Sequence, residues 1–279
     1  MKKTVDPSLY DRKYYTRYCG GYKEFNKSKG KLLDHRLQNI IKTIPKIKKG
    51  MEVLDVGCGR GEIVQWCAKM RAEAYGIDFS NDAILIAQEA VHTLPLSIRK
   101  RITYKVMDCK DLTFPDKYFD MIISLEVYEH LYSSEKIKML QEMKRVLKDN
   151  GTIYLHTEPN KLYQSYFYRS WSYPLSSLLI FINKIFTGRN YPNMYKLDKK
   201  VLNEQRTRHV GEPTYFSIKR DIKKVKLKGN VKTTNNIWSK PNLSWKDRLY
   251  NLVVYLDPLS KHFPFNILWG QDFMIILRK

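Results

Sequence analysis

Short apolar runs alternate with amphipathic stretches through the first half of the chain. Five runs have the length and composition of buried strands: 52–56, 74–77, 102–107, 119–124 and 152–156. Helical spacing of apolar residues separates them at 61–70, 81–91 and 134–147, and residues 148–151 predict a helix end and a turn. Alternating strands and helices form βαβ units, whose right-handed crossovers make a parallel sheet doubly wound. The pattern therefore predicts a Rossmann-like α/β fold.

This alternation stops after residue 158 and resumes at Tyr215. A helix is also predicted before the core, at 31–44, and three elements follow the break: a short helix from Tyr215 and strands at 224–233 and 272–279. Two insertions interrupt the fold, at 159–208 and 235–270. The chain thus divides into four parts: 1–45, a core at 46–158, an aromatic and basic insertion at 159–208, and 209–279.

The composition supports a globular protein, with 43% hydrophobic and 28% charged residues. No apolar window is long enough to span a bilayer, and the first residues lack the apolar region of a secretory signal. The four cysteines show no CxxC motif and no paired metal-ligand spacing, so we expect reduced thiols in a cytoplasmic protein and no metal site. These features argue against a disulfide scaffold, a zinc ribbon and an integral membrane protein.

The positive charge lies at the two ends of the chain. The net charge is +22, but residues 51–160 carry 14 basic and 17 acidic side chains, so the basic excess belongs to the flanks. Such a field favours an anionic partner, which could be nucleic acid, an acidic membrane surface or a phosphorylated substrate. A surface that is simply rich in lysine is the alternative.

Three glycines follow the first predicted strand, in the order Gly57-x-Gly59-x-Gly61. They allow the backbone to approach a ligand closely, next to the free N–H groups of the following helix. The third glycine comes one residue early for the dinucleotide pattern G-x-G-x-x-G. The loop therefore predicts a ligand other than a dinucleotide.

Acidic residues end the next two strands. Asp78, at the end of the second, can accept both hydroxyls of a ribose. Asp108 ends the third and can accept from an adenine amino group, while the backbone N–H of Cys109 donates to the ring. Together with the glycine loop, these strand ends predict a site for an adenosine that carries no pyrophosphate. The alternative for each acid alone is a helix cap or a surface charge.

The motifs VLDVGCGRGE, GIDFS, VMDCKDLTFPDKYFDMIISLEVYEHL and MKRVLKDNGTIYLHTEPN resemble those of class I S-adenosylmethionine-dependent methyltransferases, in particular the methyltransferase type 11 group that includes the ubiquinone-biosynthesis enzymes. The resemblance covers residues 50–160 closely and 210–279 loosely. It implies a seven-stranded, mostly parallel sheet with a C-terminal antiparallel hairpin, interrupted here by the two insertions. It also implies S-adenosyl-L-methionine as the cofactor, bound by the core at 46–158.

The resemblance assigns roles to individual residues. Asp55 orients the glycine loop, in which Gly57, Cys58, Gly59 and Gly61 lie against the methionine part of the cofactor. Asp78 holds the ribose, and three residues surround the adenine: Phe79, Asp108 and Cys109. Leu125 and Glu126 line the sulfonium end. A tyrosine-bearing segment around Tyr14 forms a lid within a basic helical region over 1–45; a basic arm is the alternative.

A hydroxyl acceptor requires a general base, for which histidine is best suited. His130 follows the fourth strand, and one helical turn places it on the same face as Glu126. His209 lies where the first insertion returns to the fold. We predict catalytic roles for these three residues; a helix-start or core histidine is the alternative. The segment SLEVYEH lacks the Asn/Asp-Pro-Pro-aromatic motif and the cysteine typical of nucleic-acid base methylation, which makes nucleic acid a less favoured partner.

The insertion at 159–208 is expected to cap the acceptor. Its apolar helix at 174–186 either packs on the domain as a lid or lies in a membrane interface. We therefore predict a methyltransferase that O-methylates a small-molecule, sugar or lipid-linked glycan or prenyl acceptor. We expect it in the cytoplasm, with peripheral contact to the anionic inner membrane surface as a further expectation. An RNA methyltransferase and a non-catalytic cofactor-binding protein are the alternatives.

Overall fold

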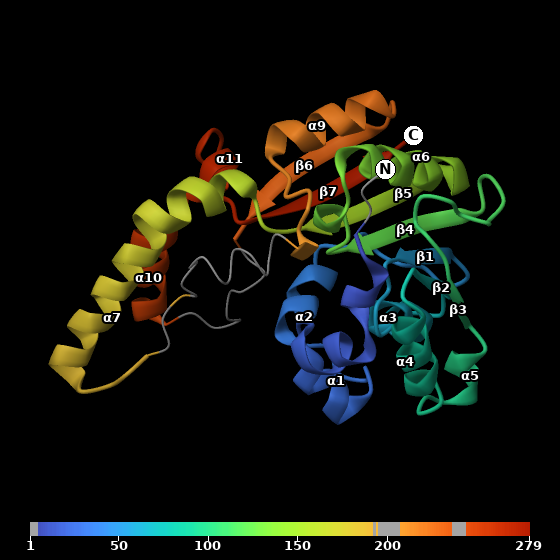
Figure 1. The fold of residues 1–279 in the computed structure, drawn as a ribbon, viewed down its shortest axis with the longest axis horizontal. Coiled ribbons are helices and arrows are strands. Elements are labelled where there is room, and N and C mark those ends of the chain that lie inside the picture. Colours follow the sequence, from blue (N-terminus) through green and yellow to red (C-terminus); the bar gives the residue numbers. More distant parts are fainter. Residues whose placement is uncertain (1–4, 192–193, 195–206, 236–243) are drawn as a thin grey trace.

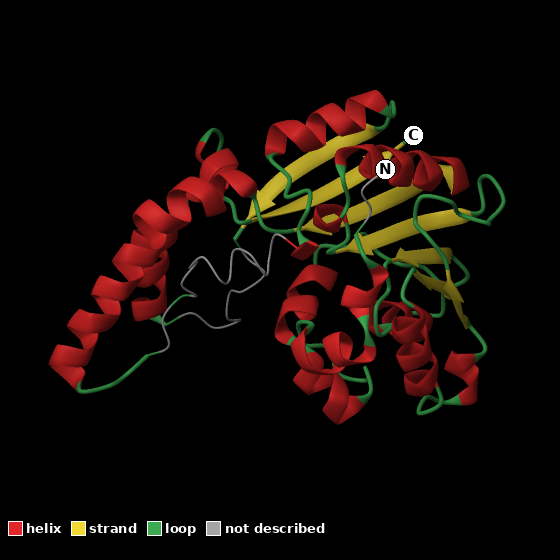
Figure 2. Ribbon diagram, in the orientation of Figure 1, coloured by secondary structure: helices red, strands yellow, loops and turns green. Residues whose placement is uncertain are grey.

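The computed structural model describes residues 5–191, 194, 207–235 and 244–279, so parts of both predicted insertions lie outside the described residues. The described residues form one sheet of seven strands in the order β3-β2-β1-β4-β5-β7-β6 (Figure 1, Figure 2). The strands are β1 (Glu52–Val56), β2 (Glu73–Asp78), β3 (Ile102–Val106), β4 (Phe119–Leu125), β5 (Leu147–Thr157), β6 (Lys228–Thr234) and β7 (Asp272–Arg278). β7 is antiparallel to both its neighbours, and the other pairs are parallel. This confirms the predicted Rossmann-like fold.

Helices cover both faces of the sheet because both faces of the central strands are apolar. Leu54 and Val56 of β1 pack into one core with α6 (Ser133–Val146) and α9 (Tyr215–Lys224). Val53, which points the opposite way, packs with α2 (His35–Ile41) and α3 (Glu62–Lys69). α4 (Asn81–Val91) and α5 (Leu96–Arg99) follow β2 and complete the second layer. Two-sided burial of this kind leaves the carboxyl ends of the parallel strands as the place for a ligand.

The N-terminal segment is folded onto the core. It contains two short helices, η1 (Pro7–Tyr10) and η2 (Tyr14–Tyr18), followed by α1 (Tyr22–Ser28) and α2. The aromatic rings of Tyr10, Tyr15 and Phe25 are buried against small and apolar side chains of α4. This docking brings the segment to the carboxyl end of β2.

The first insertion forms an arm instead of a layer on the sheet. η4 (Tyr163–Ser172) continues into α7 (Tyr173–Thr187), and α10 (Trp245–Tyr255) of the second insertion lies beside α7. Both helices extend away from the sheet (Figure 1), and we call them the α7–α10 arm. η5 (Leu259–Lys261) and α11 (Phe265–Trp269) connect the arm to β7. Among the described helices none combines the length and apolar character that crossing a bilayer requires.

Some element boundaries differ from those expected, for local reasons. The predicted turn at 148–151 is wrong: β5 begins directly after α6, and a shift in the pairing register near Phe119 absorbs the extra residues. α2 begins at His35 instead of 31 because Asp34 caps it, accepting from two backbone N–H groups of its first turn. The strand expected from 224 begins at Lys228, since α9 continues to Lys224 to bury Ile222.

Candidate active site

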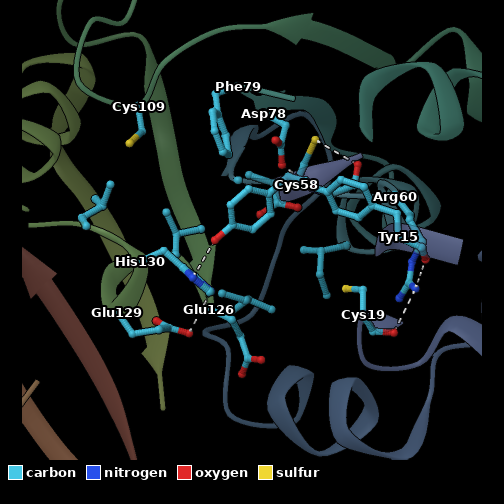
Figure 3. Close-up of a pocket in the computed structure, with 18 of the residues that line it drawn as sticks. Tyr15, Cys19, Cys58, Arg60, Asp78, Phe79, Cys109, Glu126, Glu129 and His130 are labelled. Atoms are coloured by element: carbon cyan, nitrogen blue, oxygen red, sulfur yellow. Dashed lines mark hydrogen bonds and ion pairs between the residues drawn. The ribbon is translucent and has the colours of Figure 1, made fainter. Parts of the chain in front are cut away.

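A cavity of about 290 Å³ opens at the carboxyl ends of β1, β2 and β4 (Figure 3). Its walls come from the loop after β1, the residues after β2, β3 and β4, the N-terminal segment and the segment after the first insertion. The sequence-predicted residues that line it are Tyr14, Asp55, Gly57, Cys58, Gly59, Asp78, Phe79, Asp108, Cys109, Leu125, Glu126, His130 and His209. The structure thus brings almost the whole predicted set together, with Gly61 in the loop immediately behind it.

All three loop glycines have positive φ, but the reason each must be glycine differs. A Cβ on Gly57 would lie 2.2 Å from a methyl group of Val127, and one on Gly61 would lie 2.1 Å from the hydroxyl of Tyr104. A larger residue therefore does not fit at Gly57 or Gly61, because side chains of the protein itself occupy the space. A Cβ on Gly59 would instead point toward the ring of Tyr15, 3.5 Å away, in the wall of the cavity. Of the three glycines, Gly59 is therefore the one that leaves room for a ligand to approach the backbone closely.

Asp78 fixes the loop and faces the cavity. Its carboxylate accepts from the backbone N–H of Gly59 at 2.9 Å and of Ser80 at 2.9 Å. Burial raises its pKa to about 6, and the hydrogen bonds oppose that rise, including one from the Tyr15 hydroxyl. Its donors are the backbone N–H groups of Ser80, Gly59 and Phe79 and the Tyr15 hydroxyl, so a ligand hydroxyl would share an oxygen with one of them or replace the Tyr15 hydroxyl.

Asp55 and Asp108 lie in contrasting surroundings. Asp55 is buried beneath the loop, where desolvation, with the charge of Asp78 as the next cause, raises its pKa to about 8. Asp108 lies at the mouth of the cavity, half exposed, with its carboxylate 3.1 Å from the ammonium of Lys110. The carboxylate observed to hold the loop is that of Asp78, and the predicted loop-orienting role of Asp55 stays a prediction.

Aromatic residues of the N-terminal segment cover the cavity. The ring of Tyr10 meets Phe79 edge to face at a centroid distance of 5.2 Å, and Tyr14 meets Tyr10 at the same distance. The guanidinium of Arg208 lies over the Tyr14 ring at 4.9 Å. The segment that follows the first insertion therefore lies against the N-terminal segment at the mouth of the site.

Arg60, a residue that the sequence reasoning missed, anchors this cover. The buried guanidinium donates to the backbone carbonyls of Tyr15 at 2.9 Å and Gly20 at 2.6 Å (Figure 3). It also forms a two-point ion pair with Glu62, 3.1 Å on each arm, and stacks on Phe25. This role was not predicted because an arginine in a glycine loop is typical of a surface residue.

His130 is mostly buried and neutral, and it makes contacts through its Nδ1 atom and through its ring. It ends η3 (Tyr128–His130), and its Nδ1 lies 2.8 Å from the Tyr10 hydroxyl and 3.1 Å from the Arg208 carbonyl (Figure 3). Since a carbonyl can only accept, both contacts are satisfied when Nδ1 carries the proton, which leaves the Nε2 lone pair free. Burial, with the neighbouring His209 as the next cause, lowers the pKa of His130 to about 4. His209 packs edge to face on His130 at 4.8 Å, and burial lowers its pKa too.

Glu126 is part of a buried chain of alternating charges. It forms an ion pair with Arg36, and its other oxygen lies 3.1 Å from Nδ1 of His156, whose Nε2 lies 3.1 Å from Asp272. Burial opposes ionisation, yet Arg36 and His156 hold the pKa of Glu126 down to about 2. The two carboxylates raise the pKa of His156 to about 10 against its own burial. Glu126 is therefore ionised and His156 protonated at neutral pH.

The helical turn expected to align Glu126 with His130 is wrong. Glu126 has a left-handed backbone with φ of +59°, and only the last three residues of that stretch form η3. The backbone must turn there because the Glu126 N–H donates to the His156 carbonyl on β5. The catalytic role of Glu126 stays a prediction, for a carboxylate that already neutralises two cations.

Two further acids beside this chain were missed. Burial, with the charge of Glu126 as the next cause, raises the pKa of Glu129 to about 8 and that of Glu158 to about 7. Both line the cavity near His130. A signal existed for Glu158, which directly follows the β5 end, His156-Thr157, where the fold places ligands. The described residues 159–191, predicted to cap the acceptor, do not line the cavity. His209, which directly follows the first insertion, does line it.

The core of the chain is similar in sequence to known methyltransferases. Residues 54–155 match the model of the Methyltransferase domain family. The human mitochondrial ubiquinone biosynthesis O-methyltransferase is 34% identical over 46% of this chain and 35% of its own length. Ajmaline N-methyltransferase of Rauvolfia serpentina is 34% identical over 38% of this chain and 35% of its own. The chain thus spans about a third to a half of the length of the curated relatives it matches.

The fold is shared more widely than the sequence. A SAM-dependent methyltransferase from Aquifex aeolicus matches over 98% of this chain and 97% of its own, with a TM-score of 0.51 and 16% identity. Residues 54–155 thus resemble a methyltransferase domain, and the described fold is that of solved S-adenosylmethionine-dependent methyltransferases. The residues present fit the cofactor: a buried carboxylate at the end of β2, a loop open at Gly59, and aromatic rings suited to a sulfonium in the cover.

Cofactor affinity should depend on the ionisation of Asp78. Because its folded-state pKa is about 6, only about a tenth of the carboxylates are charged one unit lower. We expect S-adenosylmethionine to bind about tenfold more weakly at pH 5 than at pH 8, as measured by calorimetry. Asp78→Asn should bind weakly at both pH values, and Asp149→Asn, an exposed site, should behave as wild type. An Asp78→Asn protein that keeps wild-type affinity contradicts the assignment.

Replacing Arg60 should release the cover. Arg60→Met removes the donors to Tyr15 and Gly20 and leaves buried Glu62 without its cation, which costs about 3–5 kcal/mol of the free energy of unfolding. We expect a lower urea midpoint and faster tryptic cleavage between residues 12 and 23. Arg60→Lys, which keeps the charge but not the fork of donors, should fall between. Equal cleavage rates in all three proteins would show that Arg60 does not anchor the segment.

Proposed function

We propose that this chain methylates a hydroxyl group, using S-adenosylmethionine as donor and His130 as general base. The observation that carries the proposal is a neutral, mostly buried histidine in the same cavity as the glycine loop and Asp78. When bound, the cofactor supplies a methyl group activated by its sulfonium. The chain's own residues then orient the acceptor, exclude water and remove a proton.

Nε2 of His130 takes the acceptor proton in this proposal. The Arg208 carbonyl and the Tyr10 hydroxyl fix the imidazole by its other nitrogen, so the ring presents one orientation and one tautomer. Nε2 lies 3.8 Å from a carboxyl oxygen of Glu129, whose raised pKa favours its neutral form at pH 7. A neutral Glu129 does not stabilise the protonated form of His130. The imidazole therefore stays unprotonated and can accept a proton.

A base with a pKa of about 4 favours an acidic acceptor. Proton transfer from an alkyl alcohol to so weak a base is strongly uphill, whereas a phenolic or enolic hydroxyl reduces the difference by several units. Among the small-molecule, sugar and lipid-linked acceptors expected from the sequence, we therefore favour one with an aromatic hydroxyl. The name of the human relative, a ubiquinone biosynthesis O-methyltransferase, supports an O-methyl product. We propose a location on the cytoplasmic side of the inner membrane.

Methyl-labelled cofactor tests the proposed function directly. The protein is incubated with labelled S-adenosylmethionine and separated lipid, glycan, RNA and protein fractions of the source cell. Label on an aromatic hydroxyl in the lipid fraction supports the proposal, whereas label on the alkyl hydroxyls of the glycan fraction supports O-methylation and overturns the aromatic acceptor. Label confined to RNA overturns the proposed acceptor class, and cofactor binding without label in any fraction indicates a non-catalytic protein.

Replacing His130 should remove the chemical step and leave cofactor binding intact. We expect His130→Gln to lower kcat by at least about 100-fold, while calorimetry with S-adenosylmethionine stays at the wild-type value. His209→Gln, which keeps the packing partner of His130 polar, should lose less. Since the His130 pKa is lowered to about 4, the base is deprotonated above that value. At saturating cofactor, kcat should therefore stay flat from pH 8 down to about 5; a fall centred near pH 6.5 would point to another base.

A further inference from the structure

The α7–α10 arm exposes two apolar stripes that the folded core does not use. On α7 the large apolar side chains are 39–82% exposed: Leu178, Phe181, Ile182, Ile185 and Phe186. Their spacing of three and four residues places them on one face. On α10 the exposed residues are Trp245, Leu249 and Leu252, again at helical spacing. Exposed contiguous apolar surface on two adjacent helices marks an interaction site.

The arm holds its shape by contacts on its other side. The Ser176 hydroxyl bonds the Tyr250 hydroxyl at 2.6 Å, and the Ser172 hydroxyl donates to the Val254 carbonyl at 2.9 Å. The indole N–H of Trp171 donates to the Val253 carbonyl at 3.0 Å. These polar contacts join the helices, so the apolar stripes lie on the sides of the helices that face away from them.

The charges around the stripes are almost all positive. Residues 163–191 contain no aspartate or glutamate, and three cations: Arg169, Lys184 and Arg189. Two more, Lys246 and Arg248, lie exposed in the first turn of α10 beside Asp247. Aromatic and aliphatic side chains bordered by cations are the composition of a helix in an anionic membrane interface.

We propose that the α7–α10 arm docks this protein on an anionic lipid bilayer. Since no described helix has both the length and the apolar character needed to cross a bilayer, α7 would lie in the membrane interface. A second copy of the chain fits less well, because a two-fold contact would bring the same cations together. The proposal rests on the proposed function in one respect: docking would present the site to a lipid-linked acceptor.

Vesicle co-sedimentation tests the arm without cofactor or acceptor. The full chain should bind vesicles of phosphatidylglycerol and phosphatidylcholine, and bind pure phosphatidylcholine more weakly. Phe181→Ser with Ile185→Ser should weaken binding to anionic vesicles at least tenfold. The matched control, Phe216→Ser with Leu96→Ser, removes equally exposed apolar side chains from α9 and α5 and should bind as wild type.

Three outcomes overturn the proposal. The first is that the protein does not bind anionic vesicles, and the second is that the arm and control variants lose vesicle binding equally. The third is that the wild type is a dimer in sedimentation velocity, the arm variant is a monomer, and neither protein binds vesicles. The last identifies a second copy as the occupant. Vesicle binding by a protein that transfers no methyl group would sustain the arm and refute the proposed function, so the two failures are distinguishable.

Discussion

The hydrogen bond between the Asp78 carboxylate and the Gly59 N–H joins the parts of this molecule that must converge for a ligand site to exist. Asp78 ends β2, Gly59 belongs to the loop after β1, and Tyr15 of the N-terminal segment bonds the same carboxylate. A buried carboxylate needs such donors, since an unpaired charge there would be strongly unfavourable. The same requirement leaves the carboxylate oriented toward the cavity. The polar contacts that stabilise the loop and those that a ribose would need are thus provided by one side chain.

Two buried histidines at the end of the sheet have opposite charge states for reasons of environment alone. His156 lies between Glu126 and Asp272, and the carboxylates raise its pKa to about 10. His130 faces His209 and two uncharged oxygens, so burial decides and lowers its pKa to about 4. One is therefore a fixed cation that binds the ends of β4, β5 and β7 together, and the other is a neutral base. Neighbouring groups with pKa values driven apart in this way are typical of acid and base assignments in active sites.

Periodicity and strand-end polarity were sufficient for the sheet and for one side of the site. Apolar runs locate β1 to β4 because burial on both faces leaves a strong signal, and the fold then collects their carboxyl ends. Contacts that depend on long-range packing could not be predicted: Arg60 under the N-terminal segment, Tyr10 against His130, and Arg36 beside Glu126 each join residues far apart in sequence. The turn expected at residues 148–151 was not found because these residues belong to β5, where the pairing with β4 passes from Leu147 to Thr152 and leaves them out.

The fold explains how charge is distributed along the sequence. The slightly acidic centre of the sequence coincides with the domain that encloses the cofactor site, where the charges are paired and buried. The basic excess lies in the N-terminal segment and in the region after β5, which includes the α7–α10 arm. A general surplus of surface lysine would be distributed over the core domain as well, and it is absent there. The cations of the α7–α10 arm lie beside its exposed apolar side chains, on a part of the molecule that contributes no residue to the walls of the cavity.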